Sequence, residues 1–297
     1  MAATQTVKVA HLGATMGYAV SNDKLDLAKP TCVMINSMCT TASLFLPQMQ
    51  SARLTDAMNL VAIEPLGHGA SSTDALHFTY WDTAVAALQV MDALKIEKAF
   101  ALGTSQGGWI IVRMALLAPE RILGLMPLGT SMDCESADSR TKGCWDPVPF
   151  GTPFLKRWAS PVPTPDFIID NDWLQPVIGL GFGAAATDDL VEFWTKTLKE
   201  VYVGDEGRRK LRLATICLAE RDGLLLRIGD IQCPVHWLHG TADPIYGTIV
   251  PTEHIKMFTS AKEAKLDFIE NGSHYLSASH PKEVETALLE FVAKHNK

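Results

Sequence analysis

The chain has 297 residues, of which 47% are hydrophobic and 20% are charged, and its formal net charge is −7. This length and composition are typical of one large globular domain, with or without an inserted segment. The negative charge argues against nucleic acid and anionic membrane surfaces as partners. We therefore expect a small-molecule partner, and the sequence leaves open whether identical chains form a homo-oligomer.

The sequence carries no sign of export or of metal binding. Residues 1–6 contain neither a basic segment nor an apolar one, so no secretory signal peptide is expected, and no apolar run is long enough to cross a bilayer. The six cysteines form no Cys-x-x-Cys pair and no cluster with zinc-ligand spacing. We expect a cytoplasmic protein with free thiols, no metal ion and no cofactor.

The first half of the chain alternates short apolar runs with helical patterns. Two segments, 7–11 and 14–20, predict an N-terminal hairpin. Buried strands are predicted over 31–35, 60–63 and 122–128 and over the short apolar run that starts at Ala99 and ends at Gly103, and helices over 80–94 and 109–118. Apolar strands that do not alternate, separated by helices, indicate a parallel sheet covered on both faces.

The pattern changes after Thr130. Residues 132–178 are rich in Pro, Trp and polar turn residues, and two helical patterns follow over 188–203 and 206–222. Buried strands return at 234–238 and 265–269, and a last helix begins near Pro281. We therefore predict a core made of residues 1–132 and 223–297, with an inserted, mainly helical lid over 133–222.

The most informative motif is Gly103-Thr104-Ser105-Gln106-Gly107-Gly108, which stands between a predicted strand and a predicted helix. Small residues at Gly103 and Gly107 allow strand and helix to approach closely, so that Ser105 projects from the tip of a tight turn. The N-terminus of the helix lies beneath it, with free N–H groups and a positive dipole end. This arrangement favours a serine nucleophile whose intermediate carries negative charge.

A serine hydroxyl needs a base, and the base needs a carboxylate to orient it. In a doubly wound sheet the functional groups gather at the carboxyl ends of the strands. Asp243 follows the predicted strand 234–238, and His274 follows the strand 265–269. The sequence therefore predicts a triad of Ser105, Asp243 and His274.

These motifs, with the loop Gly67-His68-Gly69-Ala70-Ser71, resemble those of the α/β-hydrolase superfamily over about residues 7–294. The resemblance implies an α/β fold with a doubly wound, mostly parallel eight-stranded sheet and an inserted lid. It also implies an oxyanion hole built from the backbone N–H of Gln106 and, by position, of Met38. Here the chain departs from the family, because Asn36-Ser37 replaces the usual His-Gly.

Other residues compete for the same roles. Asp133 follows the strand 122–128, where some relatives carry the acid, so it is an alternative to Asp243. His280 is an alternative base. His68 and His239 also lie in family-like loops, and we interpret them as scaffold and strand-end residues.

Several residues flank the predicted strand ends and are expected to line a largely apolar substrate pocket, together with lid aromatics such as Trp158. They are Met38, Cys39, Met132, Trp145, Ile245 and Tyr275.

The sequence thus predicts a serine hydrolase that cleaves a carboxylic ester or lactone through an acyl-enzyme. The same triad also serves C–C bond hydrolysis, acyl transfer and perhydrolysis, and a small-molecule receptor on a hydrolase scaffold is the non-enzymatic alternative.

Overall fold

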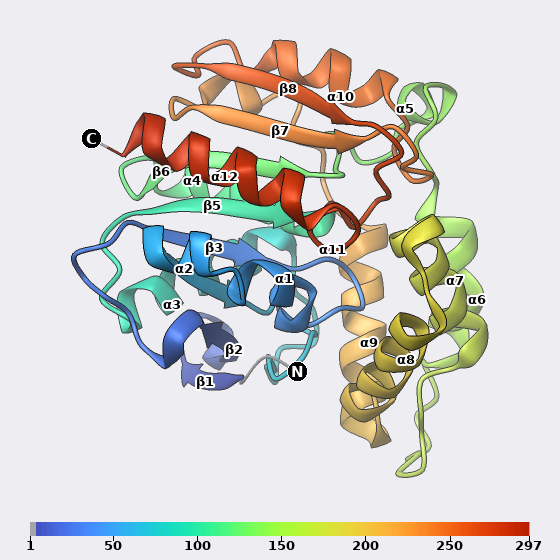
Figure 1. The fold of residues 1–297 in the computed structure, drawn as a ribbon. Coiled ribbons are helices and arrows are strands. Elements are labelled where there is room, and N and C mark those ends of the chain that lie inside the picture. Colours follow the sequence, from blue (N-terminus) through green and yellow to red (C-terminus); the bar gives the residue numbers. More distant parts are fainter. Residues whose placement is uncertain (1–3, 297) are drawn as a thin grey trace.

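Eight strands form one sheet in the computed structural model, which describes residues 4–296 (Figure 1). The strand order is β1-β2-β4-β3-β5-β6-β7-β8, in which β1–β2 and β2–β4 pair antiparallel and all other neighbours pair parallel. The strands are β1 (Gln5–Lys8), β2 (Thr15–Val20), β3 (Thr31–Ile35), β4 (Asn59–Ile63), β5 (Ala99–Thr104), β6 (Ile122–Leu128), β7 (Val235–Gly240) and β8 (Ala264–Ile269). The predicted mostly parallel eight-stranded sheet is confirmed.

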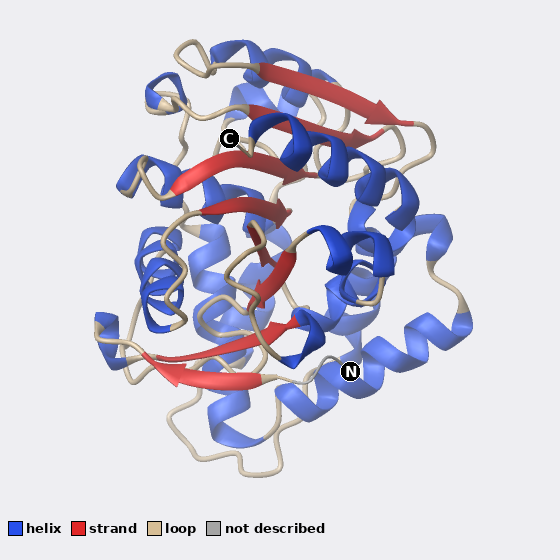
Figure 2. Cartoon of the chain, turned by 60° about the vertical axis from the view of Figure 1, so that its left-hand side comes forward, coloured by secondary structure: helices blue, strands red, loops and turns tan. Residues whose placement is uncertain are grey.

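Helices cover both faces of the twisted sheet (Figures 1 and 2). In the view of Figure 1, α1 (Leu46–Met49), α2 (Ala52–Ala57), α11 (Leu276–Ser279) and α12 (Pro281–His295) lie in front. Helices α3 (Tyr80–Ala93) and α4 (Gln106–Leu117) lie behind, and α10 (Ile249–His254) lies beside β7 and β8. The central strands β3, β4 and β5 are therefore buried on both faces, whereas the edge strands β1 and β8 stay partly exposed.

The central strands contribute to two hydrophobic cores because their side chains alternate between the faces. In β3, Val33 and Ile35 pack with α3 and α4, whereas Cys32 and Met34 pack on the side of α12. All of these side chains are fully buried. Burial on both faces explains why the central strands appear in the sequence as unbroken apolar runs.

The chain leaves the sheet after β6 and returns at β7, and five α-helices lie between these strands. They are α5 (Ala137–Thr141), α6 (Pro147–Arg157), α7 (Asn171–Phe182), α8 (Asp188–Val201) and α9 (Gly204–Ala219). Helices α6–α9 stand beside the carboxyl ends of the parallel strands (Figure 1). The division into 1–132, 133–222 and 223–297 stays a prediction, and residues 1–3 and 297 lie outside the described part.

The ends of this helical region, called the lid below, meet at a narrow neck. The backbone N–H of Leu224 donates to the carbonyl of Met132 at 2.8 Å.

Within residues 4–296, no helix is both long and apolar enough to cross a membrane, and no group of three or more His, Cys, Asp or Glu side chains could hold a metal ion. All six cysteines are free thiols.

Candidate active site

Ser105 occupies a strained turn between β5 and α4. Its backbone has φ 55° and ψ −118°, a left-handed region that costs a non-glycine residue about 1–3 kcal/mol. Two hydrogen bonds hold the turn, from Ser105 N–H to the Leu128 carbonyl and from Thr130 Oγ1 to the Ser105 carbonyl, each 2.9 Å long. The neighbouring strand β6 and the loop after it thus fix the position of the serine.

The glycines of the motif are required by close backbone contacts. A Cβ atom on Gly107 would overlap the Ile35 carbonyl, and one on Gly103 would overlap the Gly107 carbonyl. Strand β5, strand β3 and the first turn of α4 therefore touch through their backbones. This contact is the physical reason for the Gly-x-Ser-x-Gly spacing seen in the sequence.

Asp243 and His274 meet at the ends of β7 and β8. Asp243 Oδ2 lies 2.9 Å from His274 Nδ1, and the other carboxylate oxygen accepts from the backbone N–H of Ile245 at 2.8 Å. Burial by itself raises the pKa of the Asp243 carboxyl, but the charge and hydrogen bond of His274 and the charge of His239 lower it below its ordinary value. Asp243 is thus a buried carboxylate that orients the His274 ring.

Gly129, just after β6, lets this pair approach the sheet. Its φ is +48°, and a Cβ atom there would overlap the His274 carbonyl and come within 3.2 Å of Asp243 Oδ2. The Gly129 backbone therefore packs directly against the His274 backbone and the Asp243 carboxylate.

The loop after β3 lies across from the turn at Ser105, which is called the elbow below. The Asn36 amide donates to the Thr40 carbonyl at 2.9 Å, so this side chain holds the loop in shape. Ser37 stands where relatives have glycine, but the residue with left-handed backbone is Cys39, at φ 50°. The loop thus turns without a glycine, and Met38 lies on the wall of the cavity that contains Ser105.

Gln106 opens α4, so its backbone N–H lies outside the helical hydrogen-bond ladder. Its side chain is fixed from behind, with Nε2 3.1 Å from His68 Nε2 and Oε1 accepting from the Tyr80 hydroxyl at 3.3 Å. Burial lowers the pKa of His68 to about 4, and its Nδ1 lies 3.1 Å from the Leu66 carbonyl. A neutral His68 therefore donates from Nδ1 and accepts from Gln106, which agrees with its predicted scaffold role.

Ser105 and His274 border the same cavity, which is partly open to solvent. The lid contributes aromatic and aliphatic side chains to its wall, among them Trp145, Phe150, Trp173, Val177 and Leu180. The core contributes others, among them Ser37, Met38, Ile245, Tyr246 and Tyr275. Four of the predicted pocket residues, Met38, Trp145, Ile245 and Tyr275, thus lie on this wall.

The other predicted pocket residues lie elsewhere. Cys39 is buried behind the wall, where its sulfur accepts from Trp173 Nε1 at 3.3 Å. Met132 belongs to the core on the α4 side of the sheet. Trp158 packs on the far side of Trp173, with ring centroids 5.1 Å apart, and donates to Asp170.

The lid rests directly on the turn that carries His274. The Tyr275 backbone N–H donates to the Gly181 carbonyl at 2.8 Å, and a Cβ atom on Gly181 would overlap the Tyr275 ring. The Tyr275 hydroxyl donates to the Met38 carbonyl at 3.1 Å. Tyr275 therefore connects helix α7, the turn that carries His274 and the loop after β3.

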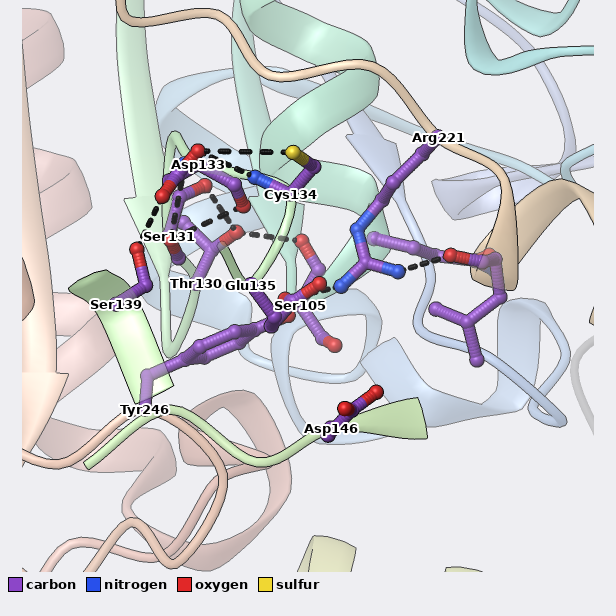
Figure 3. A network of polar contacts seen from close by, with 12 residues as sticks. Ser105, Thr130, Ser131, Asp133, Cys134, Glu135, Ser139, Asp146, Arg221 and Tyr246 are labelled. Atoms are coloured by element: carbon purple, nitrogen blue, oxygen red, sulfur yellow. Dashed lines mark hydrogen bonds and ion pairs between the residues drawn. The ribbon is translucent and has the colours of Figure 1, made fainter. Parts of the chain in front are cut away.

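The rival acid has different partners. Asp133 accepts hydrogen bonds from Ser139 Oγ and from the Cys134 backbone N–H (Figure 3). It accepts a third from Ser136 Oγ. Burial raises the pKa of this carboxyl, but these donors lower it below its ordinary value. Asp133 thus stabilises the start of α5, while Asp243 is the carboxylate bonded to His274.

The two remaining histidine candidates do not line the cavity that Ser105 borders. His280 Nδ1 lies 3.0 Å from Ser279 Oγ at the start of α12. His239 is fully buried behind the acid, with Nε2 3.6 Å from Asp243 Oδ2, and burial lowers its pKa.

Sequence reasoning missed much of the lid wall, including Phe150, Trp173, Val177, Leu180 and Gly181. The last four recur at helical spacing on one face of α7, which was a usable signal. Arg221 and Tyr246 were also missed. Tyr246 could have been found, because it stands three residues after Asp243, and in the structure its backbone N–H donates to Asp243 Oδ1 at 3.3 Å.

Comparison with known proteins identifies the family of this chain. A model of the "Alpha/beta hydrolase family" matches residues 32–287. The chain belongs to the alpha/beta hydrolase family. Its fold and elbow are thus those of an α/β hydrolase, and the predicted resemblance is confirmed.

Two characterised relatives match only short stretches of this α/β hydrolase. An acetyltransferase component of the acetoin-cleaving system of Cupriavidus necator is 36% identical over 24% of this chain and 19% of its own length. A 2-heptyl-3-hydroxy-4-quinolone dioxygenase of Rhodococcus erythropolis is 29% identical over 32% of this chain and 34% of its own length. The matches thus cover about a fifth and a third of those relatives.

Solved structures match over almost the whole chain at low identity. A thermophilic esterase from Thermogutta terrifontis covers 100% of both chains, with 15% identity and a TM-score of 0.76. The enol-lactonase from Burkholderia xenovorans has 19% identity and a TM-score of 0.75, and the match covers 97% of this chain and 100% of the enol-lactonase. These likenesses show the fold.

Proposed function

We propose that this α/β hydrolase cleaves a carboxylic ester or lactone of a small, largely apolar substrate through an acyl-enzyme. The observation that carries the proposal is the buried hydrogen bond between Asp243 and His274, on the same cavity as a serine at a strained turn. An esterase and an enol-lactonase with the same fold support the choice of reaction.

In the first half of the reaction, Ser105 Oγ attacks the substrate carbonyl carbon while His274 Nε2 takes the hydroxyl proton. The carbonyl oxygen becomes an oxyanion, which the backbone N–H groups of Gln106 and Met38 stabilise. Asp243 stabilises the imidazolium that forms. The tetrahedral intermediate then breaks its bond to the alcohol oxygen, and His274 returns the proton to the departing alcohol.

In the second half, water attacks the acyl carbon and gives a proton to His274. The bond to Ser105 Oγ breaks, the serine regains its proton and the carboxylic acid leaves. For a lactone the alcohol and the acid are two ends of one product. None of these steps requires a group other than the side chains and backbone N–H groups named here.

The cavity wall indicates the kind of substrate. Aromatic rings from the lid and from the core line the cavity that Ser105 borders, which favours a largely apolar substrate. Apolar walls exclude water and strengthen the interactions with the oxyanion.

The test is hydrolysis of p-nitrophenyl esters and of simple lactones, combined with labelling by a fluorophosphonate. We expect turnover, a covalent adduct on Ser105, and a loss of activity in Ser105→Ala of about 10⁴-fold or more. The variant should keep the circular dichroism spectrum and melting temperature of the parent. Turnover by Ser105→Ala, or ligand binding by the parent without any adduct, would refute the mechanism and favour a receptor role.

A further inference from the structure

One charged group on the cavity wall has no part in the proposed chemistry. Arg221 follows α9, where the lid returns to the core, and it borders the cavity beside Leu218 and Tyr246. Among the described residues of this wall it carries the one permanent positive charge. A guanidinium in an apolar cavity is costly unless something compensates its charge.

Glu135 supplies the compensation. It forms an ion pair with Arg221, whose side chain is 3% exposed, while the Glu135 side chain is 2% exposed (Figure 3). Arg221 also donates to the Leu218 carbonyl and lies 4.8 Å from the Trp109 ring centroid. Replacing a buried ion pair by apolar residues is often neutral or stabilising, so stability by itself does not explain this pair.

The ion pair lies next to both halves of the catalytic geometry. Trp109 belongs to the first turn of α4, directly after the elbow. Tyr246 lies within hydrogen-bonding reach of Glu135, and its ring centroid is 5.6 Å from that of His274. Arg221 is therefore fixed on a wall that joins the serine helix to the acid turn.

The net charge of the pair restricts what Arg221 can bind. The positive guanidinium and the negative Glu135 carboxylate sum to zero, so a substrate carboxylate would add a buried negative charge without a partner. A neutral oxygen, such as a ketone or amide carbonyl, accepts from a guanidinium N–H without that penalty. Nearby, Phe150 and Trp173 have ring centroids 4.9 Å apart and planes inclined by 30°, which favours a flat ring beside them.

We propose that Arg221, held by Glu135, determines specificity by donating a hydrogen bond to an uncharged carbonyl oxygen on an aromatic part of the substrate. The inference rests on the proposed ester or lactone hydrolysis and specifies its substrate class. The substrate accordingly has a flat aromatic body with a neutral acceptor at a distance from the scissile ester.

The test compares matched esters that differ only at the remote end. On the alcohol side these are benzyl acetate, 4-acetylbenzyl acetate and 4-carboxybenzyl acetate. On the acyl side they are methyl phenylacetate and its 4-acetyl and 4-carboxy derivatives. In one of the two series we expect the acetyl compound to exceed the unsubstituted one in kcat/KM by roughly 10-fold or more, because it bonds to a charged donor, and to exceed the carboxylate as well.

Three variants separate recognition from a structural role. In Glu135→Gln the guanidinium loses its counter-charge, so the preference should move toward the 4-carboxy compound. In the double variant Arg221→Met/Glu135→Gln, the ratio of acetyl to unsubstituted substrate should fall to about one. Arg221→Lys keeps the charge and should retain part of the preference.

The matched control is the double variant Arg113→Met/Asp222→Asn. It removes an ion pair at the neck of the lid, in which the buried Arg113 donates at 2.5 Å to Oδ1 of the half-exposed Asp222, and Arg113 lies outside the cavity wall. The acetyl preference should remain in this control.

The two proposals fail in different ways. Fluorophosphonate labelling and turnover without any acetyl preference in the parent, or a preference that persists in Arg221→Met/Glu135→Gln, overturn the inference and leave the hydrolase proposal standing. A parent that prefers the carboxylates also overturns it. Absence of labelling and of turnover on all six esters overturns the proposed function and the inference together.

Discussion

Two parts of the site are built in different ways. One is the set of strand ends that holds Ser105, Asp243 and His274, called the corner below, and the other is the cavity wall that the lid supplies. At the corner, backbones touch at Gly103, Gly107 and Gly129, where a Cβ atom would overlap neighbouring atoms. On the wall, large side chains such as Phe150 and Trp173 fill the space between helices. Substitutions at the corner would displace the backbone that positions Ser105 and His274, whereas substitutions in the wall would alter which molecules fit.

This difference shows which part of the site is tied to the reaction and which part to the substrate. The corner requires a narrow choice of residues, because only glycine tolerates such contacts. The wall accepts any set of side chains that fills its volume without strain. Substitutions at the corner should therefore act mainly on kcat, and substitutions in the wall mainly on substrate preference.

The largest effect is expected at Asp243, the carboxylate bonded to His274. Asp243→Asn removes the negative charge that orients and stabilises His274, so kcat for p-nitrophenyl esters should fall by about 10⁴-fold. Asp133→Asn should change kcat by less than about tenfold, because Asp133 bonds to the start of α5. Steady-state kinetics on both variants decides between them, and a larger loss in Asp133→Asn would contradict the assignment of the acid.

A smaller effect is expected where the wall touches the corner. An alanine at Gly181 would displace the Tyr275 ring beside His274, so Gly181→Ala should lower kcat/KM roughly 10- to 100-fold. Gly179 lies on the same helix with open space around its Cβ position. Gly179→Ala should therefore keep kcat/KM and stabilise α7 by up to about 1 kcal/mol. Equal kinetic losses in both variants would show that α7 does not act through Tyr275.

The smallest effect concerns the scaffold behind the corner and appears in stability. Burial lowers the pKa of His68 to about 4 from an ordinary value of 6.5, so the unfolded chain binds a proton at higher pH than the folded chain. The contribution of His68 to the free energy of unfolding is fully present above pH 6.5. It is lost as the pH falls toward 4, by up to about 3 kcal/mol. Urea unfolding at pH 7 and pH 4.5 should show a smaller drop in His68→Gln than in the parent.

His77→Gln provides the control for this measurement, since the His77 side chain is 54% exposed. Its drop in stability between the two pH values should match that of the parent. A drop in His68→Gln as large as in the parent would contradict the account of a buried neutral His68.

The same division explains how much could be predicted from the sequence. Strands β3 and β6 have the predicted bounds, 31–35 and 122–128, because strands buried on both faces leave apolar runs. The spatial pairing of Asp243 with His274 followed from the rule that functional groups gather at strand ends.

The lid was less predictable. Helices α6 and α7 were not predicted, because Pro153 and Pro176 lie inside them and proline normally ends a helix. Their burial of Phe154 and Trp173 outweighs that penalty. The pairing of Glu135 with Arg221 left no sequence signal, since the two residues stand at opposite ends of the lid and no local spacing connects them.

The neck of the lid has a consequence for how this protein can be altered. The bond between Leu224 and Met132 brings the two ends of the insertion together, and the cost of closing a loop rises only slowly with its length. Lids of other lengths can therefore be grafted onto the same core between these two points. A replacement lid must contain both Glu135 and Arg221 or neither of them, because a lid with only one of the two buries a charge without its partner.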